Sequence, residues 1–238
     1  MSSAQTVLKN ILLKQDQKMA CVFDLDSTLF NVSPRTQKIL QDYGHSSLGH
    51  PHFSSQKEIL KKIQILPTDW GIREALIREN VSAPLTFFED VRRFWRQHFF
   101  SNEYLQFDRP YPGAVEFVDQ ISKAGIPIYY LTGRDRPDMH TGTVETLQKW
   151  GFPTEQIEGR LFMKPSKNYS EDEDYKVQIL TQFSTRYKTL YFFENEPVII
   201  NQVQKVLPDV NIIFMDTVHS RRENPPNDIV HLTGDFTT

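Results

Sequence analysis

The chain of 238 residues has little of several features that would place it in a specialised class of protein. Its single cysteine, Cys21, excludes an internal disulfide, so the fold requires no oxidising compartment. No window approaches the run of about 18 apolar residues that spans a bilayer. Positive charge is not in excess, because 27 Lys and Arg stand against 30 Asp and Glu. We therefore expect no membrane span and no nucleic-acid partner.

The N-terminal segment, residues 1–17, carries apolar residues at helical spacing, among them Val7, Leu8 and Ile11. Lys9, Asn10 and Lys14 interrupt the apolar stretch that a signal peptide needs. The pattern predicts a short amphipathic helix packed on the core. We expect a cytoplasmic protein.

The residues most informative about chemistry are Asp24 and Asp26, which end an apolar run from Met19 to Phe23. Residues i and i+2 of a strand point to the same face, so the two carboxylates would share one side. Carboxylates that close repel one another unless a cation or a proton lies between them. The pair is either a surface turn ending a strand or a catalytic pair that holds Mg²⁺.

From Tyr111 onward, helical and strand patterns alternate. The predicted helices are 112–124, 142–150, 174–183 and 197–206, and the predicted strands are 126–131, 189–193 and 211–215. Strands separated by helices indicate an α/β fold with a mainly parallel sheet and helices on both faces.

The region between the first strand and Tyr111 is helical in pattern, with helices predicted over 33–44, 56–65, 69–78 and 84–100. We therefore predict a core domain of residues 1–30 and 110–238, with an inserted α-helical cap of residues 31–109. The linkers 30–34 and 107–111 would form the hinge between them.

Every predicted strand of the core is followed by polar residues suited to a phosphate or a metal. They are Asp24-Leu25-Asp26, Thr132-Gly133-Arg134-Asp135, Glu194-Asn195-Glu196 and Asp216-Thr217. Ligands of open α/β sheets bind at the carboxyl ends of the strands. The four strand ends therefore predict one site.

With these four segments the chain resembles the haloacid dehalogenase-like (HAD) superfamily, which consists mostly of Mg²⁺-dependent phosphatases with a Rossmann-like core. Asp24-Leu25-Asp26-Ser27-Thr28 fits the family's Asp-x-Asp-x-Thr motif. Thr132 after an apolar strand, a lysine further on and an acidic pair after the next strand follow in the family's order, over residues 19–216.

The resemblance implies that Asp24 attacks phosphorus and that Asp26 serves as general acid and base. It also implies that Asp24 and the backbone carbonyl of Asp26 ligate Mg²⁺. Thr132 takes the place of the family's phosphate-binding hydroxyl. Thr28, Gly133 and Arg134 fall on the substrate side, although Arg134 could equally pack structurally.

The resemblance also implies a lysine that neutralises Asp24 and the phosphoryl group, and we expect it to be Lys176, with Lys164 as the rival. The acidic pair departs from the family's two aspartates, because Glu194 and Asn195 stand in their place. Both retain oxygen ligands for Mg²⁺, but the amide brings no charge. Glu196 could compensate.

The resemblance thus implies a Mg²⁺-dependent phosphomonoesterase with an aspartyl-phosphate intermediate. Its substrate would be a small phosphorylated metabolite of the nucleotide or sugar phosphate class. The alternatives are a phosphotransferase such as a phosphomutase, or a catalytically silent binding protein with this fold. Oligomeric state has no signature in the sequence.

Overall fold

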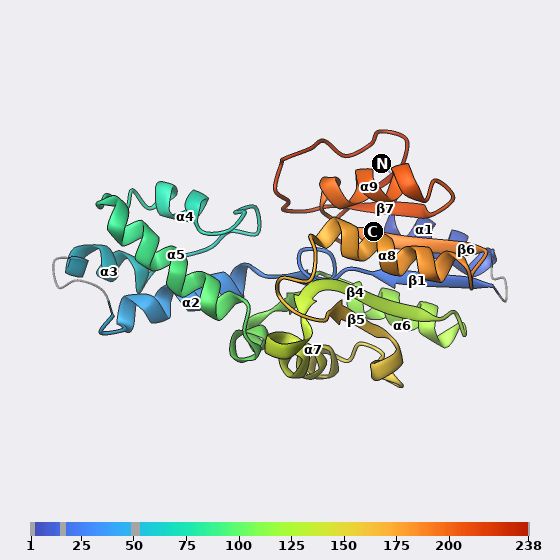
Figure 1. Cartoon of the computed structure of the whole chain (residues 1–238), viewed down its shortest axis with the longest axis horizontal. Coiled ribbons are helices and arrows are strands. Elements are labelled where there is room, and N and C mark those ends of the chain that lie inside the picture. The colour runs from blue at the N-terminus through green and yellow to red at the C-terminus, as the bar shows by residue number, and fades with distance from the viewer. Residues whose placement is uncertain (1–2, 15–17, 49–52, 238) are drawn as a thin grey trace.

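The computed structural model describes residues 3–14, 18–48 and 53–237, in an α/β part and a smaller helical part (Figure 1). The helical part lies at the left of Figure 1 and contains α2 (Ser33–His45), α3 (Ser54–Leu60), α4 (Arg73–Arg78) and α5 (Leu85–Phe99). Among the described residues, no helix combines the length and the apolar character needed to cross a membrane.

The α/β part is built on a six-stranded sheet with the order β5-β4-β1-β6-β7-β8. Each neighbouring pair is parallel, so all six carboxyl ends lie at the same edge. The strands are β1 (Met19–Phe23), β4 (Ile128–Asp135), β5 (Leu161–Lys164), β6 (Thr189–Glu194), β7 (Asn211–Asp216) and β8 (Val230–Thr233). The predicted α/β fold class is confirmed.

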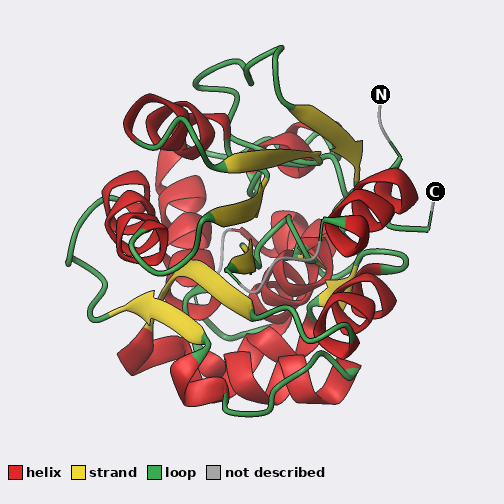
Figure 2. Cartoon of the chain, turned by 90° about the vertical axis from the view of Figure 1, so that its right-hand side faces the viewer, coloured by secondary structure: helices red, strands yellow, loops and turns green. Residues whose placement is uncertain are grey.

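Helices cover both faces of this sheet, as seen from the right-hand side of the molecule in Figure 1 (Figure 2). One apolar cluster joins the sheet to α1 (Ala4–Leu13), α6 (Ala114–Lys123) and α7 (Arg136–Trp150). A second cluster joins the opposite face to α8 (Asp172–Ser184) and α9 (Pro197–Val206). Burial on both faces explains why β1 is apolar at every position.

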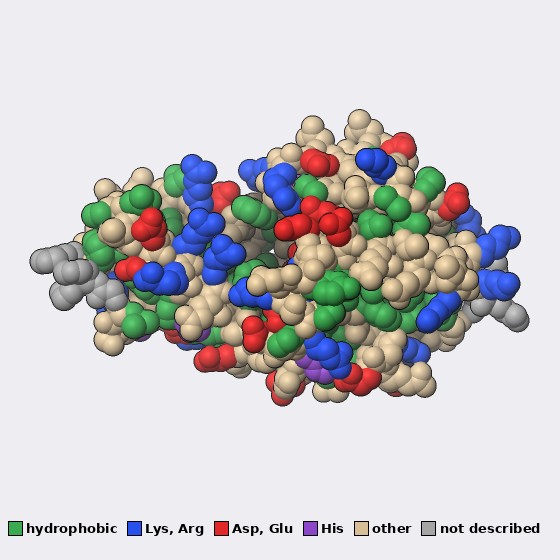
Figure 3. All heavy atoms as spheres, in the orientation of Figure 1, with side chains coloured by type: hydrophobic (Ala, Val, Ile, Leu, Met, Phe, Trp, Pro, Cys, Tyr) green, Lys and Arg blue, Asp and Glu red, His purple; other side chains and the backbone are tan. Residues whose placement is uncertain are grey.

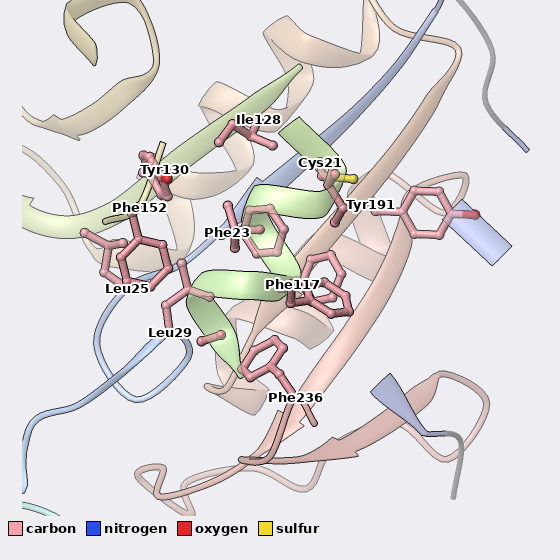
Figure 4. Packing of buried hydrophobic residues seen from close by; sticks show 14 of the residues in the cluster. Cys21, Phe23, Leu25, Leu29, Phe117, Ile128, Tyr130, Phe152, Tyr191 and Phe236 are labelled. Carbon is pink, nitrogen blue, oxygen red and sulfur yellow. The ribbon is translucent and has the colours of Figure 1, made fainter. Parts of the chain in front are cut away.

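Aromatic packing fixes the central strand (Figure 4). The ring of Phe23 stacks on Phe193 of β6, with ring centroids 4.5 Å apart, and meets Phe117 of α6 edge-on at 6.4 Å. Phe117 also contacts Phe236 near the C-terminus, at 5.1 Å. These contacts anchor the strand that ends at Asp24.

The helical part has an apolar cluster of its own, drawn entirely from residues 40–91. Two short antiparallel strands, β2 (Phe30–Asn31) and β3 (Arg109–Pro110), pair where the chain leaves and re-enters the α/β part. A 3₁₀ helix, η2 (Asn102–Phe107), precedes β3, and a second one, η3 (Ile157–Gly159), precedes β5. The domain boundaries between residues 30 and 31 and between residues 109 and 110 stay a prediction. The separate apolar cluster of the helical part supports them.

Several predicted elements differ from those observed. The helix predicted over 142–150 begins at Arg136, because Asp135 caps it by accepting a hydrogen bond from the Asp138 N–H at 3.0 Å. Gly142 lies inside this helix, where an added Cβ would come 2.5 Å from the Asn102 carbonyl oxygen. The glycine therefore marks close packing against η2 and not a helix end.

Other predicted bounds were too long or too short. The helices predicted over 56–65 and 69–78 are the shorter α3 and α4, and β5 and β8 were missed because each has four residues. Thr132–Asp135, expected to follow the strand predicted over 126–131, instead continues β4, with an irregular register against β5. The N-terminal helix is confirmed as α1, while residues 1–2 and 15–17 of that prediction lie outside the described residues.

We expect Phe117→Ala to lower the free energy of unfolding by about 3–5 kcal/mol, because it removes a buried ring from three aromatic contacts. Leu85→Ala is the control, since Leu85 is 71% exposed and should change stability by less than about 0.5 kcal/mol. Urea unfolding of the two variants measures the difference. Equal losses would contradict this account of the core.

Candidate active site

The turn after β1 places Asp24 and Asp26 at the carboxyl edge of the sheet. The Asp24 N–H still donates to the Phe193 carbonyl of β6, at 3.0 Å. The Leu25 carbonyl then accepts from the N–H groups of Thr28, Leu29 and Phe30 at 3.2, 3.0 and 2.9 Å. This tight turn holds Ser27 at φ 63°, a left-handed conformation uncommon for a residue with a side chain.

Lys176 lies between the carboxylates of Asp24 and Glu194. Its ammonium donates to Asp24 Oδ1 at 2.6 Å and to Glu194 Oε2 at 2.7 Å. All three side chains are at most 5% exposed. Asp24 follows β1 and Glu194 ends the neighbouring β6, so the parallel register brings the two acids together. Lys176 reaches them from α8.

This buried ion triad shifts the pKa of each of its members. Burial raises the pKa of Asp24, and it raises that of Glu194 to about 7, against the opposing attraction of Lys176. Burial alone would lower the pKa of Lys176, but the two carboxylates outweigh it and raise that pKa. Lys176 is therefore protonated, and its positive charge stabilises the ionised forms of Asp24 and Glu194.

Asp26 belongs to a second ion cluster, with Arg35, Asp108 and Arg134. The guanidinium of Arg35 donates to Asp26 Oδ1 at 2.7 Å and to Asp108 Oδ1 at 2.9 Å. Arg134 donates to the same Asp26 Oδ1 through Nη2 and, at 3.2 Å, through Nε. Its Nη2 also donates to Asp108 Oδ2 at 2.8 Å. We call these four residues the quartet.

The quartet joins Asp26, in the turn after β1, to three other parts of the chain. Arg35 comes from the first turn of α2, Asp108 follows η2 just before β3, and Arg134 belongs to β4. The Arg35, Arg134 and Asp108 side chains are at most 1% exposed, whereas that of Asp26 is 30% exposed. Asp26 is thus the member of the quartet that solvent or a substrate can reach.

The two guanidinium groups determine the charge state of Asp26. Burial raises its pKa, but the attraction of Arg134 and Arg35 outweighs burial and holds the pKa well below its usual range. Burial instead raises the pKa of Asp108 to about 6, in spite of the same two arginines. Asp26 is therefore a carboxylate in this arrangement.

The remaining predicted site residues line the same edge. Thr132 is buried in β4, and its hydroxyl accepts from the Arg134 N–H at 3.3 Å. The Thr28 hydroxyl donates to Asn195 Oδ1 at 3.1 Å, while Asn195 Nδ2 donates to the Val218 carbonyl at 2.7 Å. These bonds fix the amide with its oxygen toward the turn after β1.

The structure separates the two candidate lysines. Lys164 ends β5 and donates to Asp172 Oδ1 at 2.9 Å, and it is Lys176 that contacts Asp24. Gly133 packs so closely on the Asp172 carboxylate that an added Cβ would overlap it. The expected place of Gly133 on the substrate side stays a prediction.

Two residues of the site were missed from the sequence, Arg35 and Asp108. Asp108 lies in the predicted hinge linker 107–111, and Arg35 directly follows the linker 30–34. An isolated Asp or Arg at such a place carries no motif. Arg134 was predicted either to bind a substrate anion or to pack structurally. Its side chain bonds Asp26, Asp108 and, at 3.1 Å, the Thr143 hydroxyl, which fits the structural alternative.

The oxygens at this edge suit a hard divalent cation. When both are ionised, Asp24 and Glu194 carry two negative charges against the one positive charge of Lys176, and the Asn195 side chain adds a carbonyl oxygen. Carboxylate and carbonyl oxygens are the ligands that Mg²⁺ takes. Among the described residues no three Asp, Glu, His or Cys side chains form a ready metal cluster, so backbone and amide oxygens would have to complete the set.

Comparison with known proteins assigns the family. The model of haloacid dehalogenase-like hydrolases matches residues 18–191, so this chain belongs to that family of hydrolases. A curated relative from Bacillus cereus, named "putative nucleotidase", is 28% identical over 121 residues. That match covers 49% of this chain and 54% of the relative, so it spans about half the relative's length.

Solved structures share the fold over nearly the whole chain. A "putative phosphatase" from Clostridium difficile gives a TM-score of 0.54 at 12% identity, over 92% of this chain and 95% of that one. A "putative haloacid dehalogenase-like hydrolase" from Burkholderia xenovorans gives 0.52 at 17% identity, over 93% and 96%. Similarity at these identities shows the fold alone.

The raised pKa of Glu194 predicts a pH dependence of stability. A carboxyl whose pKa rises from 4.5 to about 7 on folding stabilises the fold at low pH and loses that contribution as the pH climbs between the two values. We expect Glu194→Gln to gain stability relative to the unsubstituted chain from pH 5 to pH 7, by at most about 1.4 kcal/mol per pH unit.

Urea unfolding without added divalent cation measures this difference. Glu116→Gln, at an exposed position of α6, is the control and should show a constant difference. A constant difference for Glu194→Gln as well would contradict the assignment of a raised pKa to Glu194.

Proposed function

We propose that this hydrolase is a Mg²⁺-dependent phosphomonoesterase that forms an aspartyl-phosphate on Asp24. The observation that carries the proposal is the contact of Lys176 with both Asp24 and Glu194 at the carboxyl edge of the sheet. A buried carboxylate can act as a nucleophile when a fixed cation lies beside it. Here the Lys176 ammonium can offset the negative charge of Asp24 and that of an incoming phosphoryl group.

The residues divide the reaction into two transfers at phosphorus. In the first, an Asp24 oxygen forms a bond to phosphorus while the bond to the ester oxygen breaks, and that oxygen takes the Asp26 proton. In the second, a water oxygen bonds to phosphorus and gives a proton to Asp26, while the bond between phosphorus and the Asp24 oxygen breaks. Inorganic phosphate leaves, and the Asp24 carboxylate is restored. Asp26 is a carboxylate in the free protein and takes up the proton for the first step from solvent, which reaches its side chain, when the dianionic phosphoryl group adds negative charge beside it.

The other residues hold the phosphoryl group and its charge. Thr132 offers a hydroxyl to a phosphoryl oxygen, and Lys176 offsets the charge that gathers on Asp24. Asp24, the Asp26 carbonyl, Glu194 and Asn195 would hold Mg²⁺, which supplies a Lewis acid for the phosphoryl oxygens when bound. Thr28 orients Asn195 within this set.

The proposed substrate is a small phosphorylated metabolite, and the name of the Bacillus cereus relative favours a nucleotide. The surface is hollowed where the helical part meets the α/β part (Figure 3). Closure of a cap over this hollow would exclude water and select the substrate. The proposal includes a cytoplasmic location, in keeping with the single cysteine, Cys21, which is buried in β1.

We expect Asp24→Asn to abolish phosphate release from a panel of nucleotide and sugar phosphates, because an amide cannot take the place of the nucleophile. Asp119→Asn on α6 makes the same substitution in a surface ion pair with Lys123 and should retain full activity. Phosphate release measured for both variants with Mg²⁺ tests this.

Removing Mg²⁺ with a chelator should likewise stop turnover, and returning it should restore turnover. Binding of fluoroberyllate in the presence of Mg²⁺, followed by calorimetry, separates an enzyme lacking its substrate in the panel from a silent binding protein. The absence of both turnover and fluoroberyllate binding would refute the proposed function.

A further inference from the structure

The quartet has a feature that the proposed chemistry does not by itself require. All hydrogen bonds that the described residues make to the Asp26 side chain end on Oδ1. Both guanidinium groups converge on that one oxygen, so Oδ2 accepts no hydrogen bond from either arginine and is the oxygen able to carry a proton. A carboxylate held by one oxygen from two sides has a fixed rotamer and a defined free edge.

The guanidinium groups are themselves held by Asp108. Its Oδ1 accepts from Arg35 Nε at 2.9 Å, and its Oδ2 accepts from Arg134 Nη2 at 2.8 Å. One carboxylate thus spaces the two cations, which would otherwise repel one another in a buried place. Asp108 is therefore the one residue of the quartet that ties the positions of the two guanidinium groups to each other.

Arg35 is further restrained on the cap side. Its Nη1 donates to the Phe99 carbonyl at 3.0 Å, and its guanidinium carbon lies 4.1 Å from the centroid of the Phe99 ring. Trp95 packs on the same ring at 4.7 Å, and its indole N–H donates to the Thr36 hydroxyl at 3.3 Å. The position of Arg35 therefore follows the packing of α2 against the end of α5.

We propose that Asp108 is a positioning residue for the acid/base side chain. By fixing Arg35 and Arg134 it presents Oδ2 of Asp26 to the leaving group, and it ties this presentation to the seating of the cap helices. The inference rests on the proposed function, since it assigns a partner to the residue that protonates the leaving oxygen.

The test compares two substrates that differ in their need for an acid. An alkyl phosphate has a poor leaving group that must be protonated, whereas para-nitrophenyl phosphate leaves without a proton. We expect Asp108→Asn to lower kcat/KM about 10- to 100-fold on the alkyl phosphate and by less than about 3-fold on the aryl phosphate. This parameter covers the steps up to transfer of the phosphoryl group to Asp24, so the later attack of water does not obscure the difference.

Asp69→Asn is the matched control. Asp69 is a buried aspartate of the helical part that pairs with Arg78 at 2.7 Å, so its loss reproduces the cost of removing a buried carboxylate partner. We expect it to leave the ratio of the two kcat/KM values unchanged. Should Asp108→Asn not fold, Arg35→Lys takes its place, because an ammonium cannot bridge Asp26 and Asp108 as the planar guanidinium does.

A double-mutant cycle shows whether Asp108 acts through Asp26. Asp108→Asn should lower kcat/KM on the alkyl phosphate no further once Asp26 is replaced by Asn. Equal losses on both substrates, or additive losses in the double variant, would overturn the positioning role while the phosphatase assignment stands. An unsubstituted protein inactive on every phosphoester would overturn the proposed function, and this inference with it.

Discussion

The arrangement of charge at the carboxyl edge of the sheet depends on one constraint: buried carboxylates must have cations beside them. Asp24 and Glu194 come together because β1 and β6 are parallel neighbours, and Lys176 makes that approach tolerable. Asp26 and Asp108 meet the same constraint through Arg35 and Arg134. The two clusters differ in balance, since the first has a negative charge to spare for a cation and the second is neutral.

The two clusters also differ in which parts of the chain they connect. The first cluster lies within the α/β part and places a counter-charge beside Asp24, the proposed nucleophile. The second crosses from the α/β part to the helical part, so the geometry of Asp26 depends on both. In the proposed mechanism, a substrate that seats helices of the helical part would thereby orient Asp26, the proposed acid/base residue, whereas the contacts that hold Asp24 lie within the α/β part.

The sequence predicted those parts of the structure that local chemistry determines. Strand β1 with Asp24 and Asp26, the parallel sheet, and the choice of Lys176 over Lys164 all follow from an apolar run, alternating patterns and motif order. Arg35 and Asp108 could not be predicted, because 73 positions separate them and only the fold brings them to one carboxylate. The start of α7 was missed for a related reason, since Gly142 is explained by packing on η2 and not by its own backbone.

The most direct test of the central claim is to locate the phosphoryl group during turnover. The protein is mixed with substrate and Mg²⁺, quenched in acid within the steady state and digested, and the peptide that contains residues 19–34 is analysed by tandem mass spectrometry. The account predicts one added phosphoryl group on Asp24, absent from Asp24→Asn. Continued phosphate release by Asp24→Asn, or a phosphoryl group on another residue, would contradict it.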